Sequence, residues 1–209
     1  LGSQDFMGLT FKVNEHVLIP RQDTETLTEL VLQEQKDRKK KVLDLCTGSG
    51  CIAISLGVLG GYEDVTAVDL SAEALKVARE NGERLLGRDR TIRFLQGDLF
   101  DCVEGRFDII TANPPYVATQ VIRGLAPEVR DYEPRIALDG GEDGLVFYRK
   151  ILEGSRSHLK KGGMLFFEIG YDQGRAVSKM MRETGFLDVQ VRKDYAGLDR
   201  VVFGTRSFA

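Results

Sequence analysis

Histidine and cysteine are scarce in this sequence, with two and three residues respectively among 209. His16 and His158 stand too far apart to indicate a metal site. The three cysteines show neither metal-ligand spacing nor a disulfide framework, and an odd number of them is typical of the reducing cytoplasm. The scarcity therefore predicts a cytoplasmic protein without a bound metal.

Long apolar runs and a strong excess of charge are absent as well. No apolar stretch approaches the length of a membrane span and no signal peptide heads the chain, so we expect no membrane contact. The net charge of −3 counts against tight, sequence-independent nucleic-acid binding, although a further basic domain could supply the charge. The basic run Arg38-Lys39-Lys40-Lys41 is more typical of a solvated linker than of a nucleic-acid patch.

The motif Asn113-Pro114-Pro115-Tyr116 is the most informative feature that the sequence contains. It directly follows residues 107–112, an apolar stretch typical of a buried parallel strand. Proline donates no ladder hydrogen bond and pushes the preceding residue into an extended conformation, so the motif predicts a rigid turn at the end of the strand. An amide side chain and a free carbonyl held side by side can accept both N–H bonds of a planar NH2 group. An ordinary Pro-Pro loop with Asn as a turn former is the alternative.

A glycine-rich turn lies upstream, between an apolar strand at 41–46 and a helix at 50–59. The turn Thr47-Gly48-Ser49-Gly50 suits close approach of the backbone to a nucleotide-like ligand. It is not the G-x-G-x-x-G pattern, because Cys46 stands at the first glycine position, and it lacks the G-K-[ST] of a P-loop. Asp69 ends the next strand, where a carboxylate can bind both hydroxyls of a ribose.

The third strand leads to Gly97-Asp98-Leu99, which places another carboxylate and an apolar side chain beside the same pocket, as an adenine ring requires. Each of these features alone is weak evidence for a binding site. Together they follow one another in strand order at one edge of the sheet, which is the usual place for a ligand in such folds. No basic residue in the first turn helps to seat a phosphate. The pattern therefore favours an adenosine ligand without phosphates, and S-adenosylmethionine is the candidate.

On these motifs the chain resembles the class I S-adenosylmethionine-dependent methyltransferases, and closely the HemK/PrmC-type protein-(glutamine-N5) methyltransferases that modify peptide chain release factors. Asn-Pro-Pro-Tyr is shared with DNA adenine and RNA guanine methyltransferases, so the specific segments are Ile-Pro-Arg-x-x-Thr-Glu and Glu-Pro-x-x-Ala-Leu. The family usually has proline at Gln22 and glycine at Cys46, and the cysteine makes the first turn less permissive. The matching segments are residues 17–25, 42–50, 67–69, 97–100, 113–116 and 132–138.

The resemblance implies an enzyme that methylates the side-chain amide of the glutamine in the GGQ motif of a release factor. Asn113 Oδ1 and the Pro114 carbonyl would each accept one N–H of that amide, and Tyr116 would pack against it. The implied catalytic residues are Asn113, Pro114 and Tyr116, and the implied substrate-binding residues are Asn113, Pro114, Pro115 and Tyr116. The residues assigned to the donor are Asp44, Cys46, Thr47, Gly48, Ser49, Gly50, Asp69, Leu70, Asp98, Leu99 and Asn113.

Strands and helices alternate along the chain, which predicts an α/β fold with a mostly parallel sheet and helices on both faces. Strands are expected at 41–46, 64–69, 91–95, 107–112, 163–169, 186–192 and 199–205, and helices at 24–35, 50–59, 72–86, 143–159 and 173–184. The last two strands should form an antiparallel hairpin at one edge, because no helix separates them. The resemblance implies the Rossmann-like, seven-stranded class I order 3-2-1-4-5-7-6.

Residues 9–19 alternate as a small N-terminal β-hairpin does, with Asn14-Glu15 at its turn. We divide the chain into residues 1–37, the hairpin and a helix that leads into the domain, and residues 38–209, the methyltransferase domain. The family also carries an N-terminal helical domain, and the chain starts just after the point where that domain would end. We therefore expect a catalytic-domain fragment, and a monomer.

Residues 116–142 form a connection long enough to be functional or disordered. We expect a structured wall beside the active site, with a solvated loop as the alternative. Two other functions stay open. The first is an amino-group methyltransferase that acts on adenine N6 or guanine N2 of a flipped base, for which Arg123, Arg130 and Arg135 could partly provide a basic pocket mouth. The second is a catalytically idle binding module, against which the intact motif residues argue.

Overall fold

A seven-stranded sheet forms the centre of the computed structural model, which describes residues 2–87 and 90–207. The strand order is β5-β4-β3-β6-β7-β9-β8, and β9 runs antiparallel to both of its neighbours while the other pairs are parallel. This is the predicted order 3-2-1-4-5-7-6, so the class I prediction is confirmed. The strands are β3 Lys41–Leu45, β4 Asp64–Asp69, β5 Ile92–Gln96, β6 Phe107–Ala112, β7 Leu159–Glu168, β8 Phe186–Lys193 and β9 Asp199–Arg206.

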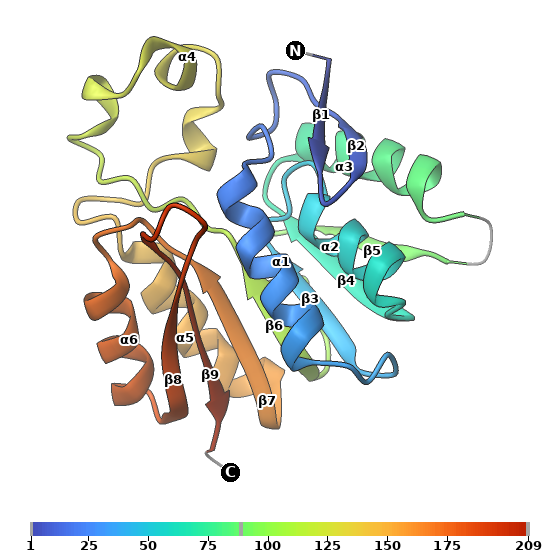
Figure 1. Cartoon of the computed structure of the whole chain (residues 1–209), viewed down its shortest axis with the longest axis vertical. Helices are drawn as coiled ribbons and strands as arrows, with labels where there is room; N and C mark the ends of the chain where they lie inside the picture. The colour runs from blue at the N-terminus through green and yellow to red at the C-terminus, as the bar shows by residue number, and fades with distance from the viewer. Residues whose placement is uncertain (1, 88–89, 208–209) are drawn as a thin grey trace.

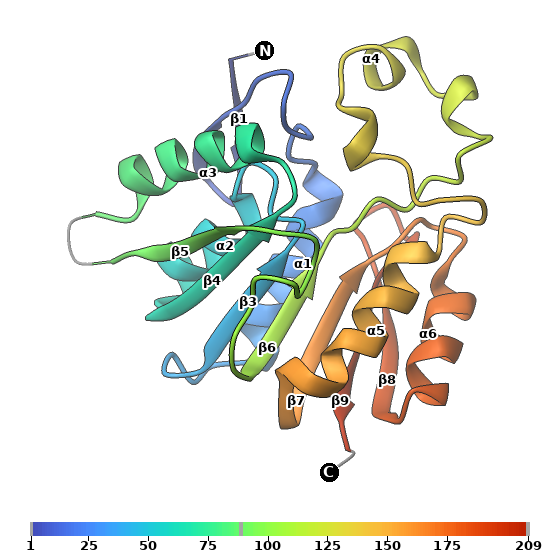
Figure 2. The same cartoon turned by 180° about the vertical axis from the view of Figure 1, so that it is seen from behind.

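Helices cover both faces of the sheet. On one side α2 packs against both α1 and α3, and on the other side α5 and α6 pack together (Figures 1 and 2). Their bounds are α1 Gln22–Glu34, α2 Cys51–Ser55, α3 Ala72–Leu85, α5 Val146–His158 and α6 Gly174–Glu183. A π-helical turn, η1 Leu56–Gly60, continues α2 and brings the whole helical stretch close to the predicted range.

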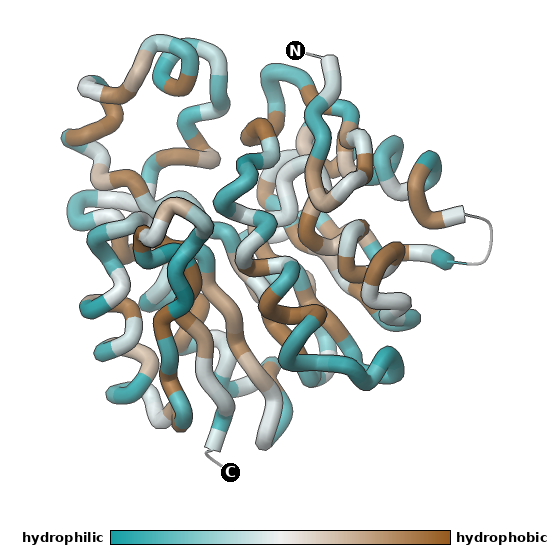
Figure 3. Tube along the Cα trace, viewed as in Figure 1, coloured by the Kyte–Doolittle hydropathy of each residue, from teal (hydrophilic) through white to brown (hydrophobic). Residues whose placement is uncertain are grey.

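Alternation along the strands separates two hydrophobic cores, because successive side chains point to opposite faces of a sheet. In β3, Leu43 and Leu45 belong to the core under α5 and α6, whereas Val42 belongs to the core under α1 and α2. Phe166 of β7 likewise packs opposite to its neighbours. Burying a side chain of this size contributes about 1.5–3 kcal/mol. In Figure 3 brown segments gather in the strands, while the charged connection between α1 and β3 is teal.

The N-terminal hairpin lies earlier in the chain than predicted. Its strands are β1 Ser3–Phe6 and β2 Leu9–Lys12, so the predicted turn at Asn14-Glu15 is wrong. The actual turn is Met7-Gly8, with φ of 54° and 73°, and two consecutive positive φ values match the twist of a tight two-residue hairpin. Residues 13–19 follow the hairpin, and the buried side chains of Val13 and Val17 pack with Ala74 and Val77 of α3.

The connection at 116–142 is structured. It contains the short turns η2 Ile122–Gly124, α4 Pro127–Arg130 and η3 Arg135–Ala137. Its two ends are joined where Val117 and Asp139 form an isolated parallel bridge. Figures 1 and 2 show the segment around α4 projecting beyond the end of the sheet.

Candidate active site

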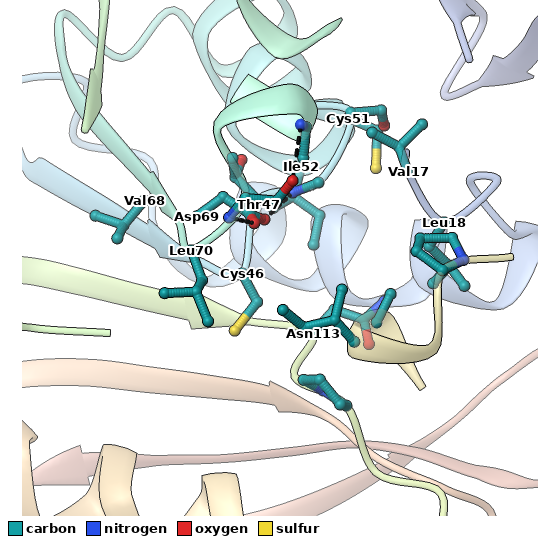
Figure 4. Close-up of a pocket in the computed structure, with 18 of the residues that line it drawn as sticks. Val17, Leu18, Cys46, Thr47, Cys51, Ile52, Val68, Asp69, Leu70 and Asn113 are labelled. Carbon is teal, nitrogen blue, oxygen red and sulfur yellow. Dashed lines mark hydrogen bonds between the residues drawn. The ribbon is translucent and has the colours of Figure 1, made fainter. Parts of the chain in front are cut away.

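A cavity lies at the carboxyl ends of β3, β4, β5 and β6, and the empty space between its walls, with the part open to solvent included, is about 940 Å³. Because a neighbouring cavity has less empty space by this measure, we call this one the larger cavity. In Figure 4, Val68 and Leu70 lie on one side of it, Val17 and Leu18 lie on the other, and Asn113 lies between them. The predicted site residues that line it are Cys46, Thr47, Gly48, Ser49, Asp69, Leu70, Asp98, Leu99, Asn113 and Pro115. The structure thus brings the motifs of four strand ends together.

The turn after β3 is held by the backbone. Thr47 N donates to Val68 O at 3.0 Å, and Gly50 N donates to Thr47 O at 2.8 Å. Gly48 has φ +54°, and a Cβ there would meet nothing within 4 Å, so the cavity comes close to its backbone. A Cβ on Gly50 would lie 2.8 Å from Ile54 Cδ1, at a φ of +81°. Gly50 therefore allows the turn to pack closely against α2, and it does not line the cavity.

Cys46 adopts a left-handed backbone conformation, with φ +58°. This conformation costs a residue with a Cβ about 1–2 kcal/mol, and it suits glycine, the residue that the resemblance implies at this place. Burial raises the pKa of the Cys46 thiol well above its ordinary value, so the group stays neutral beside the nearby carboxylates.

Asp69 organises the floor of the larger cavity. Its Oδ2 accepts the N–H of Gly48 at 2.8 Å, and its Oδ1 accepts the N–H of Ser71 at 2.9 Å. Burial raises its pKa, and backbone hydrogen bonds from Ser71, Gly48 and Leu70 oppose the rise. A carboxylate offers about four lone-pair sites, so acceptor capacity remains for a further donor. A ribose hydroxyl suits that remaining capacity.

Asp44 lies behind the turn rather than on the wall of the larger cavity. The hydroxyl of Thr47 donates to its Oδ2 at 2.6 Å, and that of Thr111 donates to its Oδ1 at 2.7 Å. Burial raises the pKa of this fully enclosed carboxyl to about 7, although both hydroxyls lower it. Asp44 was predicted to contact the donor; here it supports the turn that would do so.

The far end of the larger cavity combines a carboxylate with apolar walls. Asp98 is partly exposed, Leu99 is buried and Leu70 is exposed. Among the lining residues that the structure describes, the basic side chains are His16 and Arg21. A ligand with an adenine ring, a ribose and no phosphates fits this donor set, because two carboxylates would repel a phosphate.

A second cavity, whose empty space by the same measure is about 530 Å³ and which we call the smaller cavity, adjoins the first and shares Leu18, Arg21, Asn113 and Ala137 with it. It is lined by Pro114 and Tyr116. Asn113 therefore stands where the two cavities meet. A ligand in the larger cavity and a side chain in the smaller one would approach each other at this residue.

The sequence analysis predicts no site role for several residues that lie near the two cavities. Thr24 and Glu133 lie in the segments that carry the resemblance, which was the available signal. Glu168 and Asn81 carry no such signal, because their surroundings arise only in the fold. Asn81, fully buried in α3, donates to Ser49 O at 3.0 Å and accepts from the N–H of Lys12 at 2.7 Å, which ties the turn to the hairpin.

The described residues contain neither a candidate metal site nor a candidate membrane-spanning helix. Across residues 2–87 and 90–207, no group of three His, Cys, Asp or Glu side chains is placed to hold a metal ion. Within the same ranges, no helix combines the length and apolar character needed to cross a membrane.

Comparison with known proteins gives matches over nearly the whole chain. The family described as methyltransferase small domain matches residues 20–128. The release factor glutamine methyltransferase of Thermodesulfovibrio yellowstonii is 44% identical over 211 residues, covering 99% of this chain and 75% of that protein. The protein of the same name from Moorella thermoacetica is 46% identical over 208 residues, covering 98% and 73%.

Solved structures agree on the fold. A methyltransferase from Pyrococcus furiosus superposes with a TM-score of 0.72 at 20% identity, covering 97% of this chain and 91% of the other. Magnesium protoporphyrin IX methyltransferase from Synechocystis, crystallised with bound SAM, superposes with a TM-score of 0.59 at 15% identity, covering 89% and 80%.

Proposed function

Since the chain belongs to the family of release factor glutamine methyltransferases, we propose that it transfers a methyl group from S-adenosylmethionine to the side-chain amide nitrogen (N5) of a glutamine in a peptide chain release factor. The observation that carries this is the position of Asn113 at the junction of the two cavities. The glutamine of the release factor's GGQ motif is the proposed target. The proposed location is the cytoplasm, where release factors act, and the proposed state is a monomer.

The donor is S-adenosylmethionine, which supplies a methyl group already activated by its bond to a positively charged sulfur. Asp69 would hold the ribose hydroxyls with its remaining acceptor capacity. Asp98 would face the polar edge of the adenine, with Leu70 and Leu99 beside the ring. These roles follow from the chemistry of the cavity, whose two carboxylates also suit a cationic ligand.

The residues of the chain act mainly on the nucleophile. A carboxamide nitrogen shares its lone pair with the carbonyl and is barely basic, so it must be aligned. Asn113 Oδ1 and the carbonyl of Pro114 would each accept one N–H of the glutamine amide, and Tyr116 would pack against it. Alignment supplies several kcal/mol of such a barrier, and fixed acceptors favour the charge that develops on nitrogen. We assign no general base, since the proton can leave after methyl transfer.

A base of nucleic acid is the competing substrate, and it would need a basic pocket mouth. Arg130 is paired with Asp131 at 2.7 Å, and Arg135 is paired with Asp139 at 3.3 Å. These pairs offset the charge of two of the three arginines on the connection at 116–142. The electrostatics therefore favour a protein substrate.

The test is mass spectrometry of a release factor after incubation with this chain and S-adenosylmethionine. The expected result is one added methyl group on the glutamine of GGQ. A release factor with glutamate in place of that glutamine is the matched control and should gain no methyl group. Parallel incubations contain DNA or RNA, and methyl transfer to either of these but not to the release factor would overturn the proposal.

A further inference from the structure

Gln173, the residue directly before α6, is a half-buried amide that lines neither of the two cavities. Its side chain nevertheless bonds to three separate stretches of backbone. An amide side chain has two N–H donors and one acceptor oxygen, so the partner of each group shows what the residue holds in place.

The side-chain NH2 group of Gln173 joins the two ends of the connection at 116–142. Nε2 donates to the backbone carbonyl of Tyr116 at 3.0 Å, where the connection begins. It also donates to the carbonyl of Gly144 at a longer 3.3 Å, just beyond the place where the connection ends. Figure 2 shows both ends at the base of the segment around α4. Most of the residues that line the smaller cavity belong to this connection, so one NH2 group fastens both ends of its wall.

The acceptor side of the amide fixes which way Gln173 is turned. Its Oε1 accepts the N–H of Gly170 at 2.9 Å. The hydroxyl of Tyr148 is a weaker neighbour of this oxygen at 3.4 Å, because it donates to the carbonyl of Glu168 at 2.8 Å. Reversing the amide would set an oxygen against two carbonyls and an NH2 group against an N–H, and neither pairing forms a hydrogen bond. The segment between β7 and α6 therefore presents the NH2 group to the connection in one orientation.

Glycine lets the backbone at the far end of the connection come close to the motif. At Gly144, where φ is +72°, a Cβ would lie 2.5 Å from the carbonyl oxygen of Tyr116 and 3.0 Å from Nε2 of Gln173. At Gly140 a Cβ would lie 2.8 Å from the carbonyl oxygen of Pro115. A side chain at either position would force these groups apart. The contact is thus made by backbone groups, and Gln173 supplies the side chain that bonds to them.

Tyr116 ends the Asn-Pro-Pro-Tyr motif, so a bond to its carbonyl restrains the whole turn. The rings of Pro114 and Pro115 fix their φ at about −65°, which leaves few free backbone torsions within the motif. The hydroxyl of Tyr116 donates to Glu168 Oε1 at 3.3 Å. The backbone and the side chain of Tyr116 are therefore both held from the segment where β7 leads into α6.

We propose that Gln173 is a positioning residue for methyl transfer: its side-chain NH2 group holds the two ends of the connection at 116–142 together and thereby fixes Tyr116 and the Pro114 carbonyl at the smaller cavity. This inference rests on the proposed function. Because Gln173 lines neither cavity, its loss should slow methyl transfer and leave donor binding unchanged.

The first test is hydrogen–deuterium exchange, which needs no substrate. The N–H groups of Val117 and Thr119 donate to backbone carbonyls at the other end of the connection. Gln173→Glu keeps the size of the side chain and an acceptor oxygen but loses the NH2 group. We expect peptides that contain Val117 and Thr119 to exchange about fivefold faster or more, the scale for losing one hydrogen bond, with peptides from β3 and β4 unchanged. Gln190→Glu makes the same change of charge at an exposed residue of β8 and should match the wild type. Unchanged exchange at Val117 and Thr119 in Gln173→Glu would overturn the proposal.

The second test is kinetic, with a release factor as the methyl acceptor. Gln173→Glu should lower kcat by about 10-fold, a smaller loss than for a group that touches the substrate. The dissociation constant of S-adenosylmethionine should stay close to that of the wild type. An unchanged kcat would overturn the proposal, and so would a loss of donor affinity as large as the loss of kcat, since that pattern indicates general damage to the fold.

A pair of glycine variants tests the same contact from the opposite side. Gly144→Ala brings a Cβ against the Tyr116 carbonyl, whereas Gly162→Ala, at a φ of +75° and with nothing within 4 Å of its Cβ, carries similar backbone strain without that contact. We expect a lower kcat in Gly144→Ala than in Gly162→Ala, and equal kcat in the two would contradict the proposal. If the wild type itself methylates no release factor, the proposed function fails, and hydrogen exchange still decides whether Gln173 holds the connection.

Discussion

Arg21 Nη2 donates to Glu133 Oε1 at 2.6 Å, which joins two segments that are 112 residues apart in the sequence. These are the two segments that make the resemblance specific. The side chain of Glu133 is 2% exposed and that of Arg21 is 41% exposed, so the carboxylate of the pair is buried while the guanidinium reaches solvent. Both residues line the smaller cavity, where the pair fastens the connection at 116–142 to the chain that precedes α1.

Breaking this pair from one side should destabilise the protein more than removing its charges from both sides. Arg21→Gln leaves a buried carboxyl without its cation, which we expect to cost about 1–2 kcal/mol after allowance for the exposure of Arg21. The double variant with Glu133→Gln leaves no unpaired charge and should recover part of this loss. Urea unfolding measures all three proteins, and additive losses in the double variant would contradict the coupling.

Asp44 should make stability depend on pH. The pKa of this carboxyl is raised from 3.8 to about 7 by burial. Between these values the folded chain keeps a proton that the unfolded chain has lost, so stability falls as the pH rises through this window and then levels off. Each unit of the shift corresponds to about 1.36 kcal/mol, so the fall amounts to a few kcal/mol.

Asp44→Asn supplies the matched comparison, because an amide of the same shape cannot ionise. The stability of the variant minus that of the wild type should grow between about pH 4 and pH 7 in donor-free unfolding experiments. Burial also raises the pKa of Glu168, but that carboxyl is present in both proteins and cancels in the difference. Parallel stability curves for the two proteins would remove Asp44 as the source.

Donor affinity should depend on Asp69. Replacement by alanine removes the proposed acceptors of the ribose hydroxyls and frees the N–H groups of Gly48 and Ser71. We expect Asp69→Ala to weaken S-adenosylmethionine binding by about 1.5–3 kcal/mol, the range for charge-assisted hydrogen bonds. Isothermal titration calorimetry checks this, and an unchanged affinity would remove Asp69 from the site.

Features of the site that depend on neighbouring residues in the sequence could be predicted, whereas features that depend on contacts between distant residues could not. The strand ends that carry Asp69, Asp98 and Asn113 were predicted, because apolar runs followed by turn residues are local signals and parallel strands end at one edge. The sheet order came from the resemblance and is confirmed.

The missed features depend on contacts that a single sequence does not display. Glu168 is held by Tyr116, 52 positions away, and Asn81 by Lys12, 69 positions away. The predicted position of the hairpin was wrong because the alternation of apolar residues is compatible with more than one strand register. The positive φ values of Met7 and Gly8 place the turn at these two residues. Asp44 was assigned to the donor together with the motif that contains it, but its side chain points into the layer behind the turn, where the hydroxyl of Thr111 donates to it.

Cys46 should be a site where glycine improves the fold. Its φ of +58° is strained for a residue with a Cβ and unstrained for glycine. Cys46→Ala keeps the Cβ and removes the sulfur, so the comparison of Cys46→Gly with Cys46→Ala isolates the backbone term. We expect the glycine variant to be more stable than the alanine variant by about 1 kcal/mol in urea unfolding. A glycine variant less stable than the alanine variant would show that the strain is absent.

Asn113 is the residue on which the proposed chemistry depends. Asn113→Ala removes one acceptor, so the glutamine amide can rotate out of line and one of its N–H bonds loses its partner in an enclosed site. We expect turnover to fall at least about 100-fold, the scale for deleting one preorganised polar group. Donor affinity should change far less, because the groups proposed to hold the donor stand mainly on the ends of β3, β4 and β5.

The matched variant is Asn113→Asp, which keeps an acceptor oxygen but loses the NH2 that Thr24 accepts. It should retain more turnover than Asn113→Ala, while circular dichroism and thermal unfolding confirm that both variants fold. Single-turnover rates with a release factor separate the chemical step from donor binding. If Asn113→Ala kept near-normal turnover, the acceptor role would fail, and with it the assignment of the junction between the two cavities as the place of methyl transfer.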